Sequence, residues 1–305
     1  MLRVSTLIAL AAALLAVPTV RAAGPSMIDP ASYVYEIIDA PFGGPGTTTN
    51  LLGLNDHGQI VGFWYNPADP GNDVHPFLYD HGHFLDLDPH LNGVRDTRPS
   101  GINNKGQVVG TYRINEAVFS FLLEDGVFTT LPLPNGAQAM SINERGQIAG
   151  FLVGPSDVQG FLYDRGALTL IDVPDVDARV TAVDVNSRGQ VVGYFRNPSK
   201  ATNNYRGFVF DDGRLTTLDV SFSTPPDTTP GGINNRGQVV GSSFEWVSGR
   251  PVFLHGFFYD RGRFFRFDVG GRETILRRIN ERGQIIGTFS DGTRLLNFLA
   301  TPSSN

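Results

Sequence analysis

Residues 143–150 read Asn-Glu-Arg-Gly-Gln-Ile-Ala-Gly, and this pattern occurs six times along the chain. Each copy has an Asn, two variable residues, Gly-Gln and a short apolar run that ends in Gly. The copies begin at Asn55, Asn103, Asn143, Asn186, Asn234 and Asn280, so they recur every 40 to 48 residues. A repeat of this length indicates one supersecondary unit that is copied and buries its faces against its neighbours.

The repeat that begins at Asn143 predicts four strands and no helix. We expect the strands to cover residues 147–151, 160–163, 168–174 and 180–185. These segments are nearly continuously apolar, as in sheets that are covered on both faces, and the 3.6-residue period of a helix is absent. Four short strands within one repeat of this length are typical of a blade of a β-propeller.

Two kinds of tight turn alternate with two variable connections in every repeat. In Asn-x-x-Gly and Asp-x-Gly, the Asn or Asp side chain hydrogen-bonds the backbone ahead of it and Gly takes a positive φ. In an up-and-down blade, both tight turns then share one rim and both variable connections share the other. We call the second rim the long-loop face, and function usually sits on such loops.

The two ends of the chain predict how the ring closes. The sixth repeat stops near residue 300 without its third strand, while residues 35–41 match the third-strand segment 168–174 and precede the first repeat. An N-terminal strand that completes the last blade makes sense in a closed ring, which leaves no exposed sheet edge. We therefore predict an all-β fold: a six-bladed β-propeller of four-stranded antiparallel blades over residues 32–301, closed by its N-terminal strand.

The first 22 residues predict a secretory signal peptide. Arg3 precedes the apolar run 7–17, and Val20-Arg21-Ala22 follows with the small residues Val20 and Ala22 at the usual cleavage positions. The run is too short to span a membrane, and no other run reaches about 18 apolar residues. We expect cleavage near Ala22 and a protein that is secreted to the periplasm or beyond the cell.

Composition excludes several classes of protein. The chain has no Cys, so disulfides and thiol chemistry are absent and the fold depends on its core. A net charge of -6 argues against nucleic acid as a partner. We expect a monomer without a cofactor.

Two stretches carry a family resemblance. Residues 101–110, Gly-Ile-Asn-Asn-Lys-Gly-Gln-Val-Val-Gly, and the similar 232–241, followed by His255-Gly256-Phe257, resemble the HAF-repeat family of bacterial secreted proteins. The resemblance implies an extracellular, propeller-like protein. It implies no reaction and supplies no catalytic residues.

Aromatic residues near the ends of expected strands are the first candidates for a binding site: Trp64, Tyr65, Tyr112 and Trp246. On the long-loop face they would suit stacking on sugars or anchoring of a protein partner. The alternative is that they pack between blades.

Polar candidates lie at the start of the second strand and in the last repeat. His75, Arg206 and His255 open second strands, and two His without a third ligand do not predict a metal site. Arg277 and Arg278 are consecutive, so their side chains point oppositely and one is expected to enter the central channel. An arginine there would suit a carboxylate or sulfate; the alternative is an ion-paired or solvated surface residue.

These features favour a secreted binding module that presents a glycan or protein site on the long-loop face. The alternative is a propeller hydrolase or lyase that acts on a polysaccharide or an anionic small molecule at the channel mouth. The variable loops contain too many carboxylates to assign a catalytic pair. The sequence leaves open whether the protein catalyses a reaction.

Overall fold

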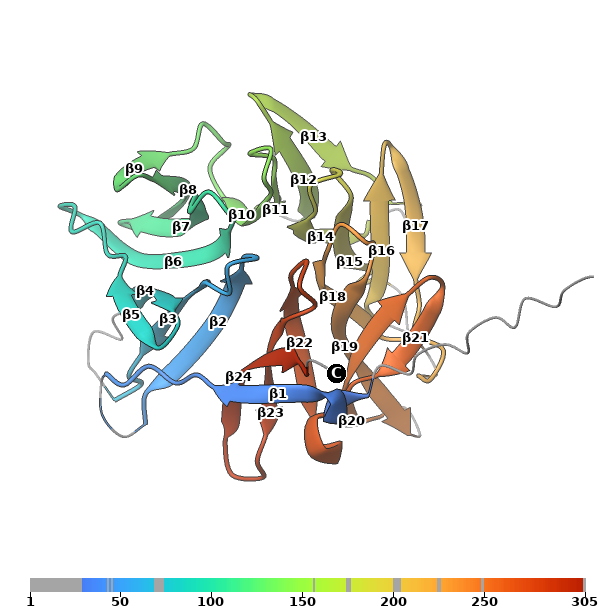
Figure 1. Ribbon diagram of the computed structural model, residues 1–305. Helices are drawn as coiled ribbons and strands as arrows, with labels where there is room; N and C mark the ends of the chain where they lie inside the picture. The colour runs from blue at the N-terminus through green and yellow to red at the C-terminus, as the bar shows by residue number, and fades with distance from the viewer. Residues whose placement is uncertain are drawn as a thin grey trace, which may run out of the picture.

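The computed structural model describes residues 29–42, 44, 46–68, 74–155, 157–173, 177–199, 204–223, 226–247 and 250–303. The expected signal peptide, residues 1–22, lies outside the described residues. Within these ranges, 24 strands form six four-stranded antiparallel sheets arranged around a central axis (Figure 1). The predicted six-bladed β-propeller is confirmed.

The blades follow one another along the chain. Blade 1 consists of β2 (Thr48–Leu54), β3 (Ile60–Tyr65), β4 (His75–Asp80) and β5 (His83–Asp86). Blade 2 consists of β6 (Val94–Ile102), β7 (Val108–Ile114), β8 (Ala117–Glu124) and β9 (Val127–Thr130). Blade 3 consists of β10 (Ala137–Ile142), β11 (Ile148–Val153), β12 (Val158–Asp164) and β13 (Ala167–Ile171).

The remaining blades repeat this order. Blade 4 consists of β14 (Arg179–Val185), β15 (Val191–Arg196), β16 (Arg206–Asp211) and β17 (Arg214–Leu218). Blade 5 consists of β18 (Thr228–Ile233), β19 (Val239–Val247), β20 (Arg250–Asp260) and β21 (Arg263–Arg266). Blade 6 consists of β22 (Thr274–Ile279), β23 (Ile285–Ser290), β24 (Leu295–Pro302) and the N-terminal β1 (Tyr33–Ile37). Two 3-10 turns complete the described elements, η1 (Pro30–Ser32) and η2 (Val269–Gly271).

The ring closes through β1. This strand pairs antiparallel with β24, with Tyr35 opposite Ala300 and Ile37 opposite Phe298, and it lies along the outer edge of blade 6 (Figure 1). The strand begins two residues before the predicted segment and ends at Ile37, because the chain then turns toward blade 1. The predicted closure by the N-terminus is confirmed, so β24 has a partner on both sides.

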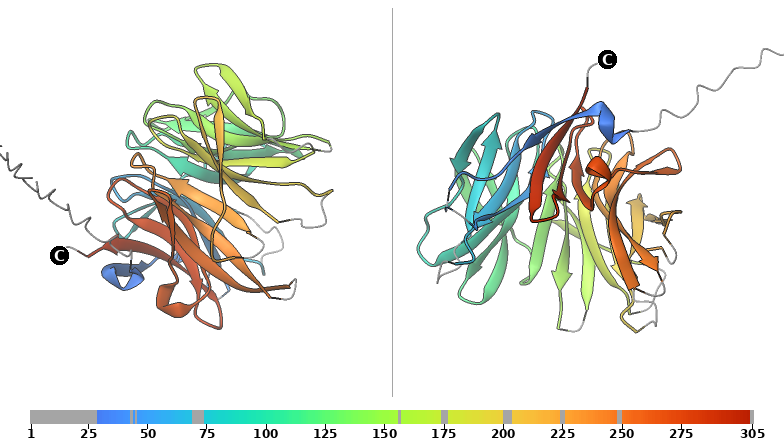
Figure 2. Two further views of the ribbon diagram at one scale, coloured as in Figure 1. Left: turned by 90° about the vertical axis from the view of Figure 1, so that its right-hand side faces the viewer. Right: turned by 90° about the horizontal axis from the view of Figure 1, so that it is seen from below.

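The sequence did not determine which strand is innermost, and the structure shows that it is the strand before each repeat Asn. The strands β2, β6, β10, β14, β18 and β22 surround the axis. The tight turns, two in each of blades 1 to 5 and one in blade 6, lie on one rim together with the C-terminus, and the variable connections lie on the opposite rim (Figure 2). The predicted division into a tight-turn face and a long-loop face is confirmed.

The repeat Asn builds its own turn and also joins neighbouring blades. In the third copy, Asn143 Oδ1 accepts from the backbone N–H groups of Arg145 and Gln147 at 2.9 and 3.0 Å. Its Nδ2 donates to the carbonyl of Asn186, the next repeat Asn, at 2.8 Å. All six copies make this last bond, and Asn280 closes the ring on the Asn55 carbonyl at 2.9 Å. The motif recurs because every blade needs both functions.

In each blade, a Phe on the strand next to the outermost one (β4, β8, β12, β16, β20 and β24) fills the core beneath the Gly that ends the apolar run. Phe161 is fully buried and faces Gly150 across the sheet. A Cβ on Gly150 would lie 2.7 Å from the Phe161 ring and 2.1 Å from the Gln138 carbonyl oxygen. Glycine is therefore required where the aromatic ring crosses the second strand. The equivalent buried rings are Phe77, Phe121, Phe208, Phe257 and Phe298.

Candidate functional site

A single arginine side chain crosses the central channel. Arg278 lies on β22 and is 7% exposed. Its guanidinium donates to backbone carbonyls of β6, β10, β14 and β18, and of its own strand. The acceptors are the carbonyl oxygens of Ser100, Met140, Val183, Gly231 and Arg277. The expectation that one of the two consecutive arginines enters the channel is confirmed, and this arginine ties the inner strands of five blades together.

The backbone provides these acceptors because every innermost strand carries a β-bulge three residues before the repeat Asn. The bulge leaves one residue unpaired in the ladder, namely Leu52, Ser100, Met140, Val183, Gly231 and Arg277. Five of these six residues offer their carbonyl to Arg278. The nearby Asp184 carboxylate accepts from the Ser141 hydroxyl and from Ile233 N, and its charge opposes the effect of burial, which lowers the pKa of Arg278.

The tight-turn mouth of the channel is lined by the residue that follows each repeat Asn. These residues are Asp56, Asn104, Glu144, Ser187, Asn235 and Glu281. All six positions take part in five hydrogen bonds between adjacent blades, in which a backbone N–H of one position donates to the side chain of the next, as when Asp56 N donates to Asn104 Oδ1 at 2.8 Å. The cavity in this mouth is small, about 70 Å³, and it is lined mainly by polar groups that already have protein partners.

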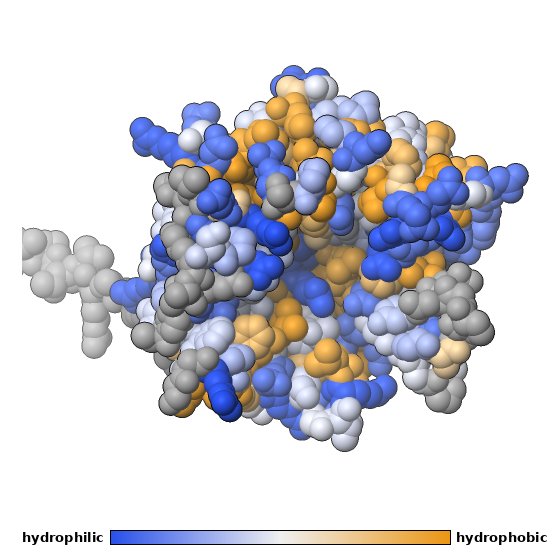
Figure 3. All heavy atoms as spheres, turned by 180° about the vertical axis from the view of Figure 1, so that it is seen from behind, coloured by the Kyte–Doolittle hydropathy of each residue, from blue (hydrophilic) through white to orange (hydrophobic). Residues whose placement is uncertain are grey.

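A larger cavity with polar lining lies instead between blades 6 and 1, and we call it the junction cavity. It measures about 540 Å³, within the range of small-molecule sites. Blade 1 contributes residues 47–50 and blade 6 contributes Arg277, Thr288, Leu295 and Asn297, with Asp39 and Arg294 at the rim. The long-loop face, seen in Figure 3, is hollowed at its centre, with hydrophilic side chains in its depth.

Three residues that line this cavity each have a buried polar atom that lacks a hydrogen-bond partner among the described residues. These atoms are Arg277 Nε, Thr288 Oγ1 and Asn297 Oδ1. The Asn297 amide is oriented by its Nδ2, which donates to the Thr49 carbonyl at 3.0 Å, so its oxygen is left as a free acceptor. Burial, and then the charge of Arg278, lower the pKa of Arg277. Arginine nevertheless keeps its proton in proteins, so the lining of the cavity includes a partly buried cation for which no ion pair is found among the described residues.

The rim of the junction cavity is formed by the connection from β1 to β2. Ala40 N donates to Thr49 Oγ1 at 3.0 Å, which holds this connection over the end of β2. Arg294 lies 3.8 Å from the Asp39 carboxylate and is two-thirds exposed. Since Asp39, Arg277 and Arg294 are the charged lining residues, the lining carries a net charge of +1.

The equivalent positions at the junction between blades 3 and 4 carry no polar side chain. Met140 and Phe151 correspond to Arg277 and Thr288. Gly160 and Val180 correspond to Asn297 and Thr49. A Cβ on Gly160 would lie 3.0 Å from Val180 Cγ1, so the two blades are in close contact. At the junction between blades 6 and 1, polar side chains occupy all four of these positions.

A second cavity lies on blade 1, beside the same connection. Trp64 stacks on His75 with ring centroids 4.0 Å apart, and Phe42 and Phe84 complete an aromatic lining around about 260 Å³. The structure thus brings two of the sequence candidates, Trp64 and His75, into direct contact. Phe42 follows Ala40, which lines the junction cavity, by two residues, so the two cavities are neighbours.

The other aromatic candidates are dispersed. Tyr112 is buried and its hydroxyl bonds Thr130 at 2.6 Å, which corresponds to the packing alternative. Trp246 donates from Nε1 to the Asp227 carboxylate at 3.1 Å. Tyr65 lies against Phe63 with ring centroids 6.3 Å apart. They belong to three different blades and do not form one collar.

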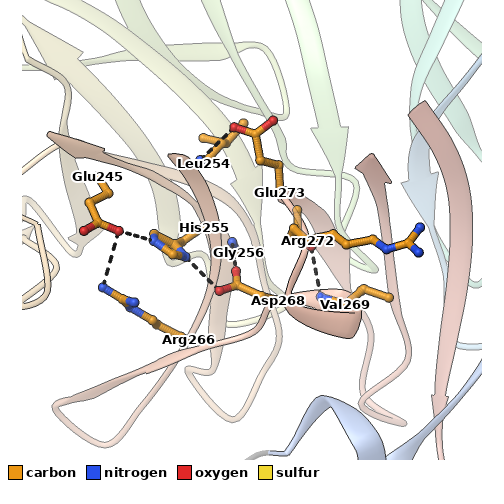
Figure 4. Close-up of polar contacts among 10 residues, drawn as sticks. Glu245, Leu254, His255, Gly256, Arg266, Asp268, Val269, Arg272 and Glu273 are labelled. Atoms are coloured by element: carbon orange, nitrogen blue, oxygen red, sulfur yellow. Dashed lines mark hydrogen bonds and ion pairs between the residues drawn. The ribbon is translucent and has the colours of Figure 1, made fainter. Parts of the chain in front are cut away.

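The two remaining polar candidates are paired with carboxylates. Arg206 is exposed and forms an ion pair with Asp219. His255 has a side chain that is only 6% exposed, and it lies between two carboxylates (Figure 4). Its Nδ1 is 2.7 Å from Asp268 and its Nε2 is 2.9 Å from Glu245.

The environment of His255 indicates a structural role. Both ring nitrogens donate to the two carboxylates only when the imidazole is protonated. Arg266 lies 4.0 Å from the same Glu245 carboxylate and over the ring of Phe222 at 4.9 Å. The hydrogen bond from His255 holds the pKa of Glu245 below its usual range. With both nitrogens engaged and little exposure, His255 joins β19, β20 and the end of β21 and has no free position for a substrate.

The sequence analysis identified Arg277 but not the residues that line the junction cavity with it, Thr288, Asn297 and Thr49. One signal was present: Asn297 replaces the Gly or other small residue that precedes the core Phe in most repeats, as in Gly160 and Gly207. A departure from the repeat at a position that faces the next blade marks the place where the packing changes. Among the described residues, no group of three or more His, Cys, Asp or Glu is placed to hold a metal ion.

Comparisons with known proteins agree with the fold. No protein-family model and no curated protein sequence matches the chain. Among solved structures, the β-propeller domain of the Trilobed protease from Pyrococcus furiosus superposes with a TM-score of 0.53 at 10% identity, covering 85% of this chain and 83% of that one. TolB from Acinetobacter baumannii gives 0.52 at 12% identity, covering 81% and 64%.

A third similar structure is the acylaminoacyl peptidase of Pyrococcus horikoshii, with a TM-score of 0.50 at 11% identity, covering 84% of this chain and 45% of that one. At these identities the likeness concerns the fold alone. The protease propeller is described as having an open velcro topology, whereas here β1 closes the ring by pairing with β24. In the part of the chain that the structure describes, no helix has the length and apolarity needed to span a membrane.

Proposed function

We propose that the protein is a secreted binding module and that its ligand occupies the junction cavity between blades 6 and 1. The observation that carries this proposal is that three residues lining one cavity, Arg277, Thr288 and Asn297, each have a buried polar atom without a hydrogen-bond partner among the described residues. Folded proteins satisfy nearly all of their buried polar groups. A ligand that supplies the missing partners is the simplest reason to keep these groups there.

The dimensions of the site favour a small molecule or the end of a glycan chain over a protein surface. The cavity of about 540 Å³ is a pocket between blades rather than an exposed patch. The aromatic cavity lined by Phe42 and Trp64 is its neighbour and supplies flat apolar faces of the kind that accommodate sugar rings.

The hydrolase or lyase alternative has less support from the same site. Acid–base hydrolysis uses two carboxyl groups that flank the scissile bond. The lining of the junction cavity includes one carboxylate, Asp39, which is already 3.8 Å from Arg294. The buried His255 network lies in blade 5 and does not line this cavity. Binding without turnover is therefore the function that the geometry supports best.

A variant that fills the cavity tests the proposal. Phe151 and Tyr194 occupy the strand position of Thr288 in blades 3 and 4, so Thr288→Phe places in blade 6 a residue that this fold already accommodates. On a glycan array, we expect Thr288→Phe to abolish the binding shown by the wild type. Thr111→Phe, at the same position of blade 2, is the matched control and should bind normally. Retained binding in Thr288→Phe would exclude the junction cavity, and conversion of the bound glycan would favour the enzyme alternative.

Export and membership of the HAF-repeat family are part of the same proposal. They are supported by the sequence of residues 1–22 and by the repeats at 101–110 and 232–241. N-terminal sequencing of the protein from the periplasm or culture medium should give a chain that starts near Ala23. A full-length chain confined to the cytoplasm would contradict export.

A further inference from the structure

The junction cavity also specifies the chemistry of its ligand. We infer that it binds a saccharide that carries a single oxyanion, with the anion on Arg277 and a hydroxyl on Asn297. This inference rests on the proposed function and adds the ligand class to it.

The charge of the cavity requires an anion. Arg277 is partly buried, and its buried Nε has no partner among the described residues. The Nε of Arg278, the next residue, also lacks a partner there, but the other guanidinium nitrogens of Arg278 donate to five carbonyl oxygens and the side chain lies in the field of Asp184. A buried charge is costly unless it is paired and hydrogen-bonded, and an oxyanion is the natural partner of a guanidinium. Arg277 is therefore the group in the cavity that selects an anionic ligand.

The net charge of the cavity lining limits the charge of the anion that it can neutralise. The charged lining residues Asp39, Arg277 and Arg294 sum to +1. A carboxylate or a sulfate ester carries one negative charge and neutralises the lining, whereas a phosphate monoester carries about -1.5 to -2 at neutral pH. A singly charged oxyanion fits this site better than a phosphate.

The other unpartnered atoms require hydroxyl groups on the same ligand. Asn297 Oδ1 is an acceptor only, because its amide nitrogen is engaged with the Thr49 carbonyl, so it needs a donor from the ligand. Thr288 Oγ1 accepts or donates. An inorganic anion would satisfy Arg277 and leave Asn297 without a donor, while a neutral sugar would do the reverse. A saccharide with one oxyanion satisfies both.

Calorimetric titration with a matched set of sugars tests the inference. The probes are D-galacturonate, galactose 6-sulfate, galactose and inorganic sulfate, each titrated into the wild-type protein at low and moderate salt. We expect the galacturonate or the galactose sulfate to bind at least about tenfold more tightly than galactose and than inorganic sulfate, as expected when a charge-assisted hydrogen bond is added or a buried acceptor is left unpaired. Which of the two sugars binds more tightly identifies the oxyanion.

Variants test which side chain is responsible for the preference for an anionic sugar. Arg277→Gln should lower the affinity for the anionic sugar about 10- to 100-fold and remove its advantage over galactose. Arg277→Lys, which keeps the charge, should bind with intermediate affinity. Arg282→Gln is the matched control, since Arg282 is an exposed arginine on the tight-turn face, and its affinity should equal that of the wild type. Asn297→Ala should weaken the anionic sugar and galactose alike.

The outcomes separate this inference from the proposed function. Equal affinities for galactose and the two anionic sugars, all reduced by Asn297→Ala, would overturn the oxyanion and leave the binding site in place. Inorganic sulfate that binds as tightly as the anionic sugars would overturn the saccharide. An affinity for the anionic sugars that is unchanged by Arg277→Gln, Asn297→Ala and Thr288→Phe would overturn both the inference and the junction cavity as the site.

Discussion

Arg277 and Arg278 are neighbours on β22, yet they lie in opposite environments. Arg278 points to the axis, where it donates to carbonyl oxygens of five blades. Arg277 points into the junction cavity, where its Nε has no partner within the described chain. Burial lowers the pKa of both side chains, and neither Nε has a partner among the described residues. The difference is that the other nitrogens of Arg278 donate to backbone carbonyls and the charge of Asp184 opposes the effect of burial there.

The difference shows how one bulged strand separates stability from binding. The bulge at Arg277 turns two successive side chains toward two different spaces, the axis and the gap before blade 1. The axis is surrounded by backbone carbonyls on all sides, so a cation there stabilises the ring. The gap is lined by side chains that differ from blade to blade, so a cation there is available to a ligand.

The largest expected effect is at the axis. Arg278→Met leaves several bulge carbonyls and the Asp184 carboxylate buried without a cation, and removal of one partner from a buried ionic network typically costs about 3–5 kcal/mol. Denaturant unfolding of the purified protein measures this loss. The double variant Asp184→Ala with Arg278→Met should recover part of the stability, because it also removes the orphaned charge. A single variant as stable as the wild type would contradict the role of Arg278.

On the tight-turn face, removal of the repeat Asn should cost the same free energy of unfolding at every junction between blades. Asn143→Ala and Asn280→Ala each remove two acceptor contacts to backbone N–H groups and one bond to the next blade. We expect each to lose roughly 2–3 kcal/mol, since several buried groups become unsatisfied. Equal losses, measured by denaturant unfolding, would show that the junction of blades 6 and 1 differs from the others only toward the long-loop face. A much smaller loss for Asn280→Ala would show that the whole junction is weak.

Alanine at two equivalent positions tests the packing difference itself. In Gly160→Ala, the new Cβ lies 3.0 Å from Val180 Cγ1 and 3.3 Å from Ala182 N, so overpacking should cost about 1–3 kcal/mol. Asn297→Ala loses the bond to the Thr49 carbonyl but also removes an unsatisfied oxygen, so its effect should stay within about 1 kcal/mol. Thermal unfolding in the absence of ligand compares the two. A neutral Gly160→Ala would mean that blades 3 and 4 are not tightly packed.

Asp227 offers the smallest effect and a contrast with Arg277, because a buried carboxyl group is able to give up its charge. Burial raises the pKa of Asp227, opposed by the hydrogen bond from Trp246, and its Oδ1 has no partner among the described residues. A raised folded-state pKa means that the proton is bound more tightly in the folded protein. The stability contribution of Asp227 is therefore full below the unfolded pKa, about 3.9, and is lost as pH rises through the folded pKa.

Unfolding followed by Trp246 fluorescence measures this effect in a Trp64→Phe background. Relative to Asp227→Asn, the parent protein should lose stability as the pH rises above about 4, by less than about 1.4 kcal/mol per pH unit, the limit for one proton. The Asn retains an acceptor for Trp246 Nε1 and serves as the uncharged control. A difference between the two proteins that does not vary with pH would contradict the raised pKa.

The architecture was accessible from the sequence because the repeat encodes it locally. The Asn of each copy makes the turn and the bond to the next blade, so six copies predict six blades. The segment that became β1 was recognisable because it matches the outer strand of the other blades, whose place in blade 6 it takes. Regular hydrogen bonding translates directly into sequence pattern.

The candidate site was accessible only in part, because it depends on which residues break the pattern and meet across a junction. Arg277 stood out as a charge in an apolar strand, but Thr288 and Asn297 are ordinary residues in isolation. Their common location follows from the radial order of the strands, which the sequence did not determine. Tyr112, chosen as a strand-end aromatic, is buried, since such positions also face neighbouring strands.

The most direct test of the central claim is a crystal structure of the protein soaked with whichever of D-galacturonate and galactose 6-sulfate binds more tightly in calorimetry. The account predicts the sugar in the junction cavity, with an oxygen of its anionic group about 3 Å from Arg277 Nε and a hydroxyl donating to Asn297 Oδ1. Sugar bound at the tight-turn mouth or on Trp64 alone, or a junction cavity that stays without it at saturating concentration, would contradict the account.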